Sequence, residues 1–226
     1  MHKIHIPTWA FDRGRRLNFF PMIQPRTTAL IVVDMQNAFV LEGQPMGNRH
    51  AFDIIPNVNT LGHAVRASGG MVVWTRHTFV ESAPFAPPPW QLNERCGYRE
   101  LMTTLAPGTL GHALHGDLIV AATDLVIDKY RYSAFIHHSS DLDAKLRAAG
   151  IDTIIVTGTV TNCCCESTAR DGNMLNYKTL FVSDGTAALT DDEHNAALLS
   201  MATIFADVRS TRECVALIAS SASLAA

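Results

Sequence analysis

The chain of 226 residues carries little charge, and none of its hydrophobic runs is long. Charged residues make up 17% and the formal net charge is −3, so we expect no basic surface for nucleic acid or an anionic membrane. No apolar run approaches the roughly 18 residues needed to span a bilayer. Residues 1–7 also lack the apolar block of a signal peptide. We therefore expect a cytoplasmic protein without nucleic-acid or membrane partners.

Cysteine is scarce too, and its arrangement does not suit disulfides. The chain has five cysteines, an odd number, and three of them are adjacent at positions 163–165. A reducing compartment fits this pattern best. Hydrophobic residues nonetheless make up 47% of the chain, which is enough for one sizeable core. The sequence therefore predicts a single domain over residues 1–226.

Short apolar runs alternate with helical patterns along most of the chain. Six runs predict strands, at residues 29–33, 71–74, 125–127, 153–156, 179–182 and, more weakly, 207–209. Helices are expected at residues 58–67, 141–149, 164–175 and 191–205. Strands that alternate with helices form parallel sheets covered on both faces. The sequence thus predicts an α/β fold, a three-layer αβα Rossmann-like sandwich around a mostly parallel six-stranded sheet.

Two regions do not follow this alternation. Residues 1–27 show no clear element and are expected to form an arm on the body or on a neighbouring subunit of a homo-oligomer, a dimer or tetramer. Residues 80–118 are rich in proline and lack periodicity. Such a long insertion is expected to be a lid or specificity loop, although a surface excursion accounts for it equally well.

The three cysteines stand where a buried strand is expected to pass into a helix capped by Asn162. A thiol in the first turn of a helix meets unpaired N–H groups and the positive end of the dipole, which favour the thiolate. The same N–H groups can hold an oxyanion. The alternative is that these cysteines only pack in the core. Since consecutive helical residues point about 100° apart, at most one of the three can face a pocket well.

Two charged residues close neighbouring strands of the predicted sheet. Asp34 follows the first strand and Lys129 closes the third, so both lie at the carboxyl edge with the cysteines. Asp34 can serve as a turn cap, and Lys129 as a surface lysine with a buried stem. Together with a thiol they instead form a nucleophilic site. Asp34 then takes the thiol proton, Lys129 holds Asp34 and Cys164 attacks.

Residues 29–39, 129–135 and 157–171 resemble three ordered motifs of the isochorismatase-like cysteine hydrolases, and the resemblance runs from about residue 27 to 211. It implies catalytic roles for Asp34, Lys129 and Cys164. Cys164 is chosen over its neighbours because the family nucleophile lies two residues after the asparagine of a Thr-Asn pair.

The resemblance also implies a non-proline cis peptide bond between Val160 and Thr161. Such bonds are costly and are found at functional sites. The N–H groups of Thr161 and Cys164 would then form the oxyanion hole.

A cysteine with aspartate and lysine resembles the amidohydrolase branch, which cleaves C–N bonds through a thioester. Within that branch nicotinamidases carry an Asp-x-His metal motif after the second strand, whereas this chain has residues 74–79, WTRHTF, without such an aspartate. We therefore expect neither a metal nor another cofactor, and we expect His77 to lie in the pocket.

The motifs are most similar to those of ureidoacrylate, N-carbamoylsarcosine and biuret amidohydrolases. The resemblance implies a small ureide or amide substrate, with release of ammonia or carbamate. Five residues are predicted to bind it, namely Asn37, His77 and Tyr132 as polar groups and Phe39 and Phe135 as walls.

Four alternatives stay open at this level. A vinyl-ether hydrolase of the isochorismatase type is disfavoured by Cys164, and a nicotinamidase-like carboxamide hydrolase by the absence of the Asp-x-His motif. A binding protein on a retired hydrolase fold would have no reason to keep all three catalytic residue types. A dinucleotide-binding domain would need a Gly-x-Gly-x-x-Gly loop after the first strand, which the chain lacks.

Overall fold

The computed structural model describes residues 1–92 and 97–224 and contains a six-stranded sheet in the order β3-β2-β1-β4-β5-β6. The strands are β1 (Thr28–Val33), β2 (Met71–His77), β3 (Leu125–Lys129), β4 (Thr153–Thr159), β5 (Lys178–Ala187) and β6 (Asp207–Arg209). Every neighbouring pair is parallel. The predicted α/β architecture is confirmed, and the sheet is parallel throughout.

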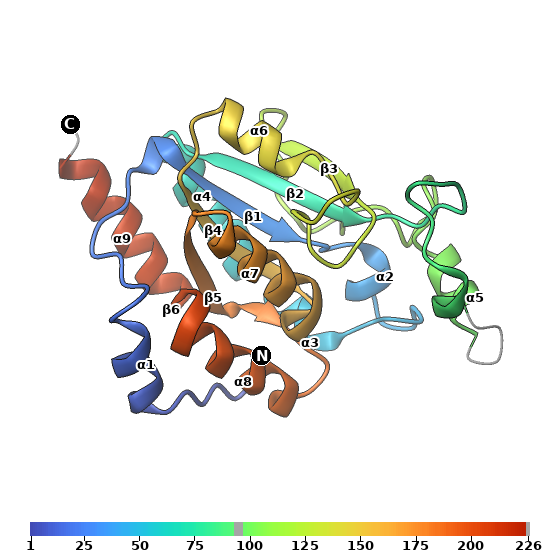
Figure 1. Ribbon diagram of the computed structural model, residues 1–226, viewed down its shortest axis with the longest axis horizontal. Helices are drawn as coiled ribbons and strands as arrows, with labels where there is room; N and C mark the ends of the chain where they lie inside the picture. Colours follow the sequence, from blue (N-terminus) through green and yellow to red (C-terminus); the bar gives the residue numbers. More distant parts are fainter. Residues whose placement is uncertain (93–96, 225–226) are drawn as a thin grey trace.

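Side chains of each central strand alternate between two buried faces. Ala29, Ile31 and Val33 of β1 belong to one core cluster, and Leu30 and Val32 belong to the other. Helices cover both faces (Figure 1). The first cluster is covered by α6 (Leu142–Ala148), α7 (Glu166–Met174) and α8 (Asp191–Ser200), and the second by α3 (Arg49–Asp53), α4 (Ile55–Ala67) and α9 (Thr211–Leu224). None of the described helices is long and apolar enough to cross a membrane.

The two ends of the chain contain more helix than the sequence patterns predicted. Residues 1–27 include α1 (Thr8–Gly14), which packs against the turn Met201–Phe205. Helix α9 was missed altogether. Its start carries a recognisable signal, because Ser210 Oγ accepts from the N–H of Glu213 and Glu213 Oε2 accepts from the N–H of Ser210. This is a capping box, and a Ser-x-x-Glu pattern before apolar residues predicts one.

The helix predicted over residues 164–175 begins differently from the expectation. A π-helical turn, Thr161–Cys165, precedes α7, and Val160 stands at its N-cap position. Asn162 lies exposed inside this turn, so its prediction as N-cap is wrong. The helix predicted over 191–205 likewise consists of α8 and a second π-helical turn, Met201–Phe205.

Residues 80–118 lie beyond the carboxyl ends of β1 and β2, with α5 (Tyr98–Thr103) projecting from the body (Figure 1). They pack against the short helix α2 (Asn37–Val40) that follows β1. A small apolar cluster joins the two segments and includes Phe39, Phe79, Met102 and Leu105. The insertion therefore has its own core and stands next to the functional edge of the sheet.

Candidate active site

The carboxyl ends of four adjacent strands bring the predicted catalytic residues together. In the register of the sheet His77 pairs with Lys129, and Val33, which precedes Asp34, pairs with Gly158. Gly158 has φ +113°, and a Cβ there would lie 2.1 Å from Val33 O. Only glycine permits this approach. It sets the end of β4, and hence the cysteine turn, against the end of β1.

Asp34 and Lys129 form an ion pair in the interior. Lys129 Nζ lies 2.7 Å from Asp34 Oδ2, and both side chains have no exposed surface. The other carboxylate oxygen, Oδ1, accepts a hydrogen bond of 2.8 Å from Thr75 Oγ1. Lys129 Nζ also donates to Arg131 O at 3.0 Å. Burying two charges is costly unless they are paired and hydrogen-bonded. Here they are paired, and Asp34 Oδ1 and Lys129 Nζ each have a further hydrogen bond.

The charge state of Lys129 follows from these neighbours. Burial alone lowers the pKa of a lysine, but the Asp34 carboxylate and the hydrogen bonds to Asp34 and Cys164 outweigh it and raise the pKa of Lys129. The group is therefore an ammonium. An ammonium can donate hydrogen bonds but cannot accept them. Lys129 therefore acts as a fixed positive charge between the carboxylate and the thiol.

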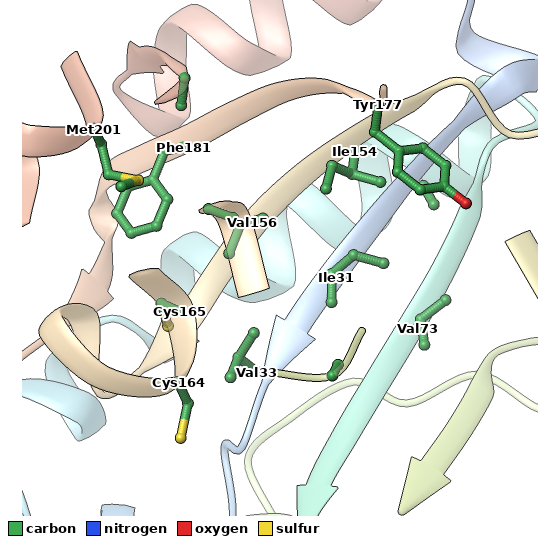
Figure 2. Close-up of a cluster of buried hydrophobic side chains, with 14 of the residues drawn as sticks. Ile31, Val33, Val73, Ile154, Val156, Cys164, Cys165, Tyr177, Phe181 and Met201 are labelled. Atoms are coloured by element: carbon green, nitrogen blue, oxygen red, sulfur yellow. The ribbon is translucent and has the colours of Figure 1, made fainter. Parts of the chain in front are cut away.

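Cys164 is the cysteine that faces this pair. Its Sγ, a ring nitrogen of His77 and a carboxylate oxygen of Asp34 all lie within 4.8 Å of one another. Cys165 instead directs Sγ at Thr157 O, 3.9 Å away in the core. In Figure 2 the Cys164 sulfur points away from Val156 and Phe181.

Burial works against a thiolate at Cys164. A hydrogen bond with Cys163 and complete burial raise the pKa of Cys164 well above its usual value, against the opposing effect of Lys129, while the same hydrogen bond lowers the pKa of Cys163. The expectation that the helix start stabilises a thiolate stays a prediction. The proton of Cys164 must leave at the moment of attack, and Asp34 is the adjacent base.

His77 is a neutral donor beside this group. Burial and the Lys129 ammonium lower the pKa of His77 to about 3. Its Nδ1 lies 3.1 Å from Lys129 Nζ, and because an ammonium can only donate, Nδ1 accepts. The ring proton then stands on Nε2. His77 lines the cavity described below, so this N–H is available to a substrate.

The same contacts affect whether a metal ion could bind in this group. Asp34, His77 and Cys164 have the donor types and spacing of a metal site. However, the Lys129 ammonium already contacts Asp34 Oδ2 and His77 Nδ1, where a cation would have to bind. These residues therefore fit a metal ion poorly. The absence of a cofactor stays a prediction.

The oxyanion hole predicted from the resemblance needs one correction. The non-proline cis peptide bond joins Thr159 and Val160, not Val160 and Thr161 as expected. In the turn that follows, the N–H groups of Cys163 and Cys165 both donate to Val160 O, at 3.0 and 3.2 Å. Neither contact uses the N–H group of Thr161 or Cys164. These two groups are the predicted oxyanion donors, and that role stays a prediction.

A cavity of about 430 Å³ opens beside this group of residues. His77 and Tyr132 line it, as predicted from the sequence, and their rings stack with centroids 6.0 Å apart. The Tyr132 hydroxyl bonds to that of Tyr98, which, with burial, raises the pKa of Tyr132. Tyr98, Phe85 and Met102, all from the insertion, also line the cavity. Sequence reasoning missed these three, since nothing in residues 80–118 shows which side chains turn inward.

Three predicted substrate contacts lie outside that cavity. Asn37 donates its side-chain N–H to Leu110 O at 3.0 Å. Phe39 belongs to the small core under the insertion, and Phe135 stacks on Tyr177 with centroids 5.5 Å apart. None of the three is among the residues that line the cavity, and their role in binding a substrate stays a prediction.

Behind the catalytic turn lies a buried histidine, His194. Its Nδ1 lies 2.9 Å from Thr161 Oγ1, and its Nε2 donates to Ser183 O at 3.0 Å. The ring of His2, from the N-terminal segment, stacks on His194 with centroids 4.2 Å apart. His2 is itself held by Asp191, 2.8 Å from its Nδ1. The N-terminal segment is thus connected to the turn that carries Cys164.

Known proteins are similar to this chain in sequence and in fold. The model of the isochorismatase domain matches residues 28–213. Ureidoacrylate amidohydrolase RutB of Yersinia enterocolitica is 38% identical over 208 residues, which cover 84% of this chain and 89% of that protein. The RutB protein of Methylobacterium radiotolerans is 35% identical over 199 residues, covering 81% of this chain and 76% of that protein.

Solved structures agree with these relatives. A cysteine hydrolase from Pseudomonas syringae pv. phaseolicola superposes with a TM-score of 0.81 at 33% identity, covering 91% of this chain and 98% of that one. N-carbamoylsarcosine amidase from Thermoplasma acidophilum gives a TM-score of 0.66 at 26% identity, covering 82% and 96%. The chain therefore belongs to the isochorismatase family, and its relatives place it among the hydrolases of that family that act on carbon–nitrogen bonds.

Proposed function

We propose that the protein is a cysteine-dependent amidohydrolase that cleaves a C–N bond of a small ureide or amide through a covalent thioester. One observation carries the proposal: the buried thiol of Cys164 lies against the Asp34–Lys129 ion pair. A nucleophile, a base and a fixed cation in contact are the parts that acyl transfer requires.

In the first half of the reaction Cys164 Sγ attacks the substrate carbonyl, and its proton passes to the Asp34 carboxylate. Lys129 stabilises Asp34 in its charged form before the transfer. The carbonyl oxygen becomes an oxyanion that accepts from the N–H groups of Thr161 and Cys164. Collapse returns the proton from Asp34 to the leaving nitrogen. An amide then leaves a thioester on Cys164 with release of ammonia, and a ureide leaves the corresponding thiocarbamate.

In the second half a water molecule attacks the acyl carbon. Asp34 takes the water proton and the Cys164 sulfur leaves as the thiol. An amide yields a carboxylic acid, and a ureide yields a carbamate. The neutral Nε2–H of His77 is placed to donate to the substrate, but a histidine with a pKa of about 3 does not serve as the proton source near neutrality.

The proposal is tested by ammonia release from a panel of N-carbamoylated amino acids, ureidoacrylate, biuret, simple ureas and nicotinamide. Turnover is expected for at least one ureide or amide and should be lost in Cys164→Ser. Cys163→Ser and Cys165→Ser are the matched controls and should keep most of it, since Cys165 faces the core. If only Cys163→Ser lost activity, Cys163 would be the nucleophile and the assignment of Cys164 would be wrong. Hydrolysis of isochorismate but of no amide would overturn the proposed function.

A further inference from the structure

The cavity beside Cys164 extends well beyond the space that a ureido group needs. Its volume, about 430 Å³, lies in the range of sites that hold drug-sized ligands. His77, which lies near the Cys164 thiol, and Tyr132, whose ring stacks on that of His77, line part of it.

Five aromatic or apolar side chains of the lining are called here the apolar wall. Phe85 stacks on Tyr130 with ring centroids 4.3 Å apart, and Met102, Ile136 and Met174 complete the wall. Ile136 and Met174 are 52% and 64% exposed. Exposed apolar side chains around a cavity gain free energy when an apolar ligand covers them.

Most side-chain donors of the two arginines that line the cavity, Arg131 and Arg170, are occupied. Arg131 donates from one terminal nitrogen to Phe85 O and Tyr130 O, at 2.8 and 2.6 Å, and from the other to backbone carbonyls of the same insertion. Arg170 pairs with Glu166 and also bonds Ser200 Oγ.

A substrate carboxylate is best recognised by a free guanidinium fork. Among the described lining residues neither Arg131 nor Arg170 presents one. The carboxylate of Asp171 also lines the cavity and offsets part of the positive charge of the two arginines.

From this wall we infer that the substrate carries an apolar, and preferably aromatic, substituent next to the group that is hydrolysed, and that it is uncharged: a monosubstituted urea or a carboxamide with an aryl or branched alkyl group. The inference rests on the proposed function, since it specifies the substrate class of the same site. It separates this chain from an enzyme that selects small carboxylates such as ureidoacrylate.

Benzylurea and ureidoacetate form a matched pair of probes. Both carry the group CH₂–NH–CO–NH₂, and they differ only in a phenyl ring against a carboxylate. Burying the ring is expected to raise kcat/KM for benzylurea at least about tenfold over ureidoacetate, mainly through KM. A preference for ureidoacetate would overturn the inference.

A charge introduced on the apolar wall tests whether the substituent binds there, because it should reverse the preference between the two ureas. Met174→Lys places a cation on the apolar wall, and Leu17→Lys is the matched control, since both side chains are 64% exposed and Leu17 lies outside the cavity. Met174→Lys should lower kcat/KM for benzylurea and raise it for ureidoacetate, whereas Leu17→Lys should change neither. Equal effects of the two variants would contradict the inference.

Binding to Cys164→Ala, measured by calorimetry with both ureas, separates the two proposals. Tighter binding of benzylurea, with no hydrolysis of either urea by the wild-type protein, would support the apolar site and refute the proposed reaction. Hydrolysis of both with ureidoacetate preferred would refute the apolar site and support the reaction. If Cys164→Ala binds neither, or binds ureidoacetate more tightly, the inference on the substrate is overturned.

Discussion

Asp34 and Lys129 carry charge in a part of the molecule where charge is costly. Each alone would be an unpaired buried ion, and removing one partner of such a pair commonly costs about 3–5 kcal/mol of stability. Both are completely buried, and Asp34 adopts φ +49°, a backbone conformation that L side chains rarely adopt. A pair of hydrophobic residues would be at least as stable. This burial of charge supports the roles that the proposed reaction gives to the pair.

This pair gives a double-mutant prediction. Asp34→Asn should lower kcat/KM by about 10²–10⁴-fold, because the acceptor of the thiol proton is lost. Lys129→Met should be similarly severe and should also destabilise the fold, because it leaves the Asp34 carboxylate buried without its cation. The double variant should be no slower than the poorer single variant and more stable than Lys129→Met. Kinetics and urea unfolding of all three measure this. Losses that multiply would mean that Lys129 acts separately, on the substrate.

Metal independence is a second residue-scale prediction. Because the Lys129 ammonium stands between Asp34 and His77, activity should survive prolonged EDTA treatment with less than about a twofold loss. The measurement is ammonia release before and after dialysis against the chelator, with zinc, manganese or iron added back. A loss that one of these metals restores would show that the ammonium yields its place to a cation.

Residue types at strand ends were predictable, whereas side-chain directions in the following turns were not. Asp34, Lys129 and Cys164 each follow or close an apolar run, and a parallel sheet brings such positions to one edge. Asn37 and Phe39 follow the same strand as Asp34, yet both side chains pack against the insertion, Asn37 through Leu110 O. Their direction depends on the path of residues 80–118, which no local pattern reveals.

Among the elements, the π-helical turn Thr161–Cys165 determines which cysteine reaches Asp34. The strands were predictable because their β-branched runs are buried on both faces. The turn was not, since its start depends on contacts made elsewhere in the fold. Thr161 is held by His194, and His194 is covered by His2 from 192 residues earlier in the chain. Such long-range contacts leave no local signal.

His194 is therefore expected to be a positioning residue. His194→Leu removes the partners of Thr161 Oγ1 and Ser183 O, and it should lower kcat at least about tenfold with little change in KM, because the turn that carries Cys164 loses its support. His194→Gln, which keeps a donor and an acceptor, should recover part of the loss.

The control for this pair is His5→Gln, an exposed residue of the same N-terminal segment, which should leave kcat unchanged. Melting temperatures of all variants should be measured with the kinetics. If kcat follows stability alone across the three variants, or if Gln and Leu behave alike at position 194, His194 has only a structural role.

At the scale of the whole molecule the order of layers was predictable, and the paths of the two ends were not. Alternating strands and helices lead to a parallel sheet with right-handed crossovers, whereas the order β3-β2-β1-β4-β5-β6 was not predicted. The N-terminal segment instead returns to the start of α8, where His2 contacts Asp191. It thereby covers His194, and the burial of this histidine, like that of His77, should appear in the global stability.

The pH dependence of unfolding is expected to report these histidines. Burial lowers the pKa of His77 to about 3, with Lys129 adding to the effect, and lowers the pKa of His194 to about 4, with His2 adding to it. In the unfolded chain a histidine has a pKa near 6.5. Below that pH the unfolded chain binds protons that the folded protein does not bind. The free energy of unfolding therefore falls as the pH falls from about 6.5 toward 4.

Each of the two histidines should contribute about 2 kcal/mol of this loss between pH 7 and pH 5, where ordinary carboxylates still stay ionised. Urea unfolding of the wild type, His77→Gln, His194→Gln and the exposed control His137→Gln at both pH values measures it. The two buried-site variants should lose less stability between pH 7 and pH 5 than the wild type, and the control should lose as much. An unchanged loss in both buried-site variants would mean that both rings bind protons in the folded state. For His77 this outcome would contradict the hydrogen bond that the Lys129 ammonium donates to its Nδ1.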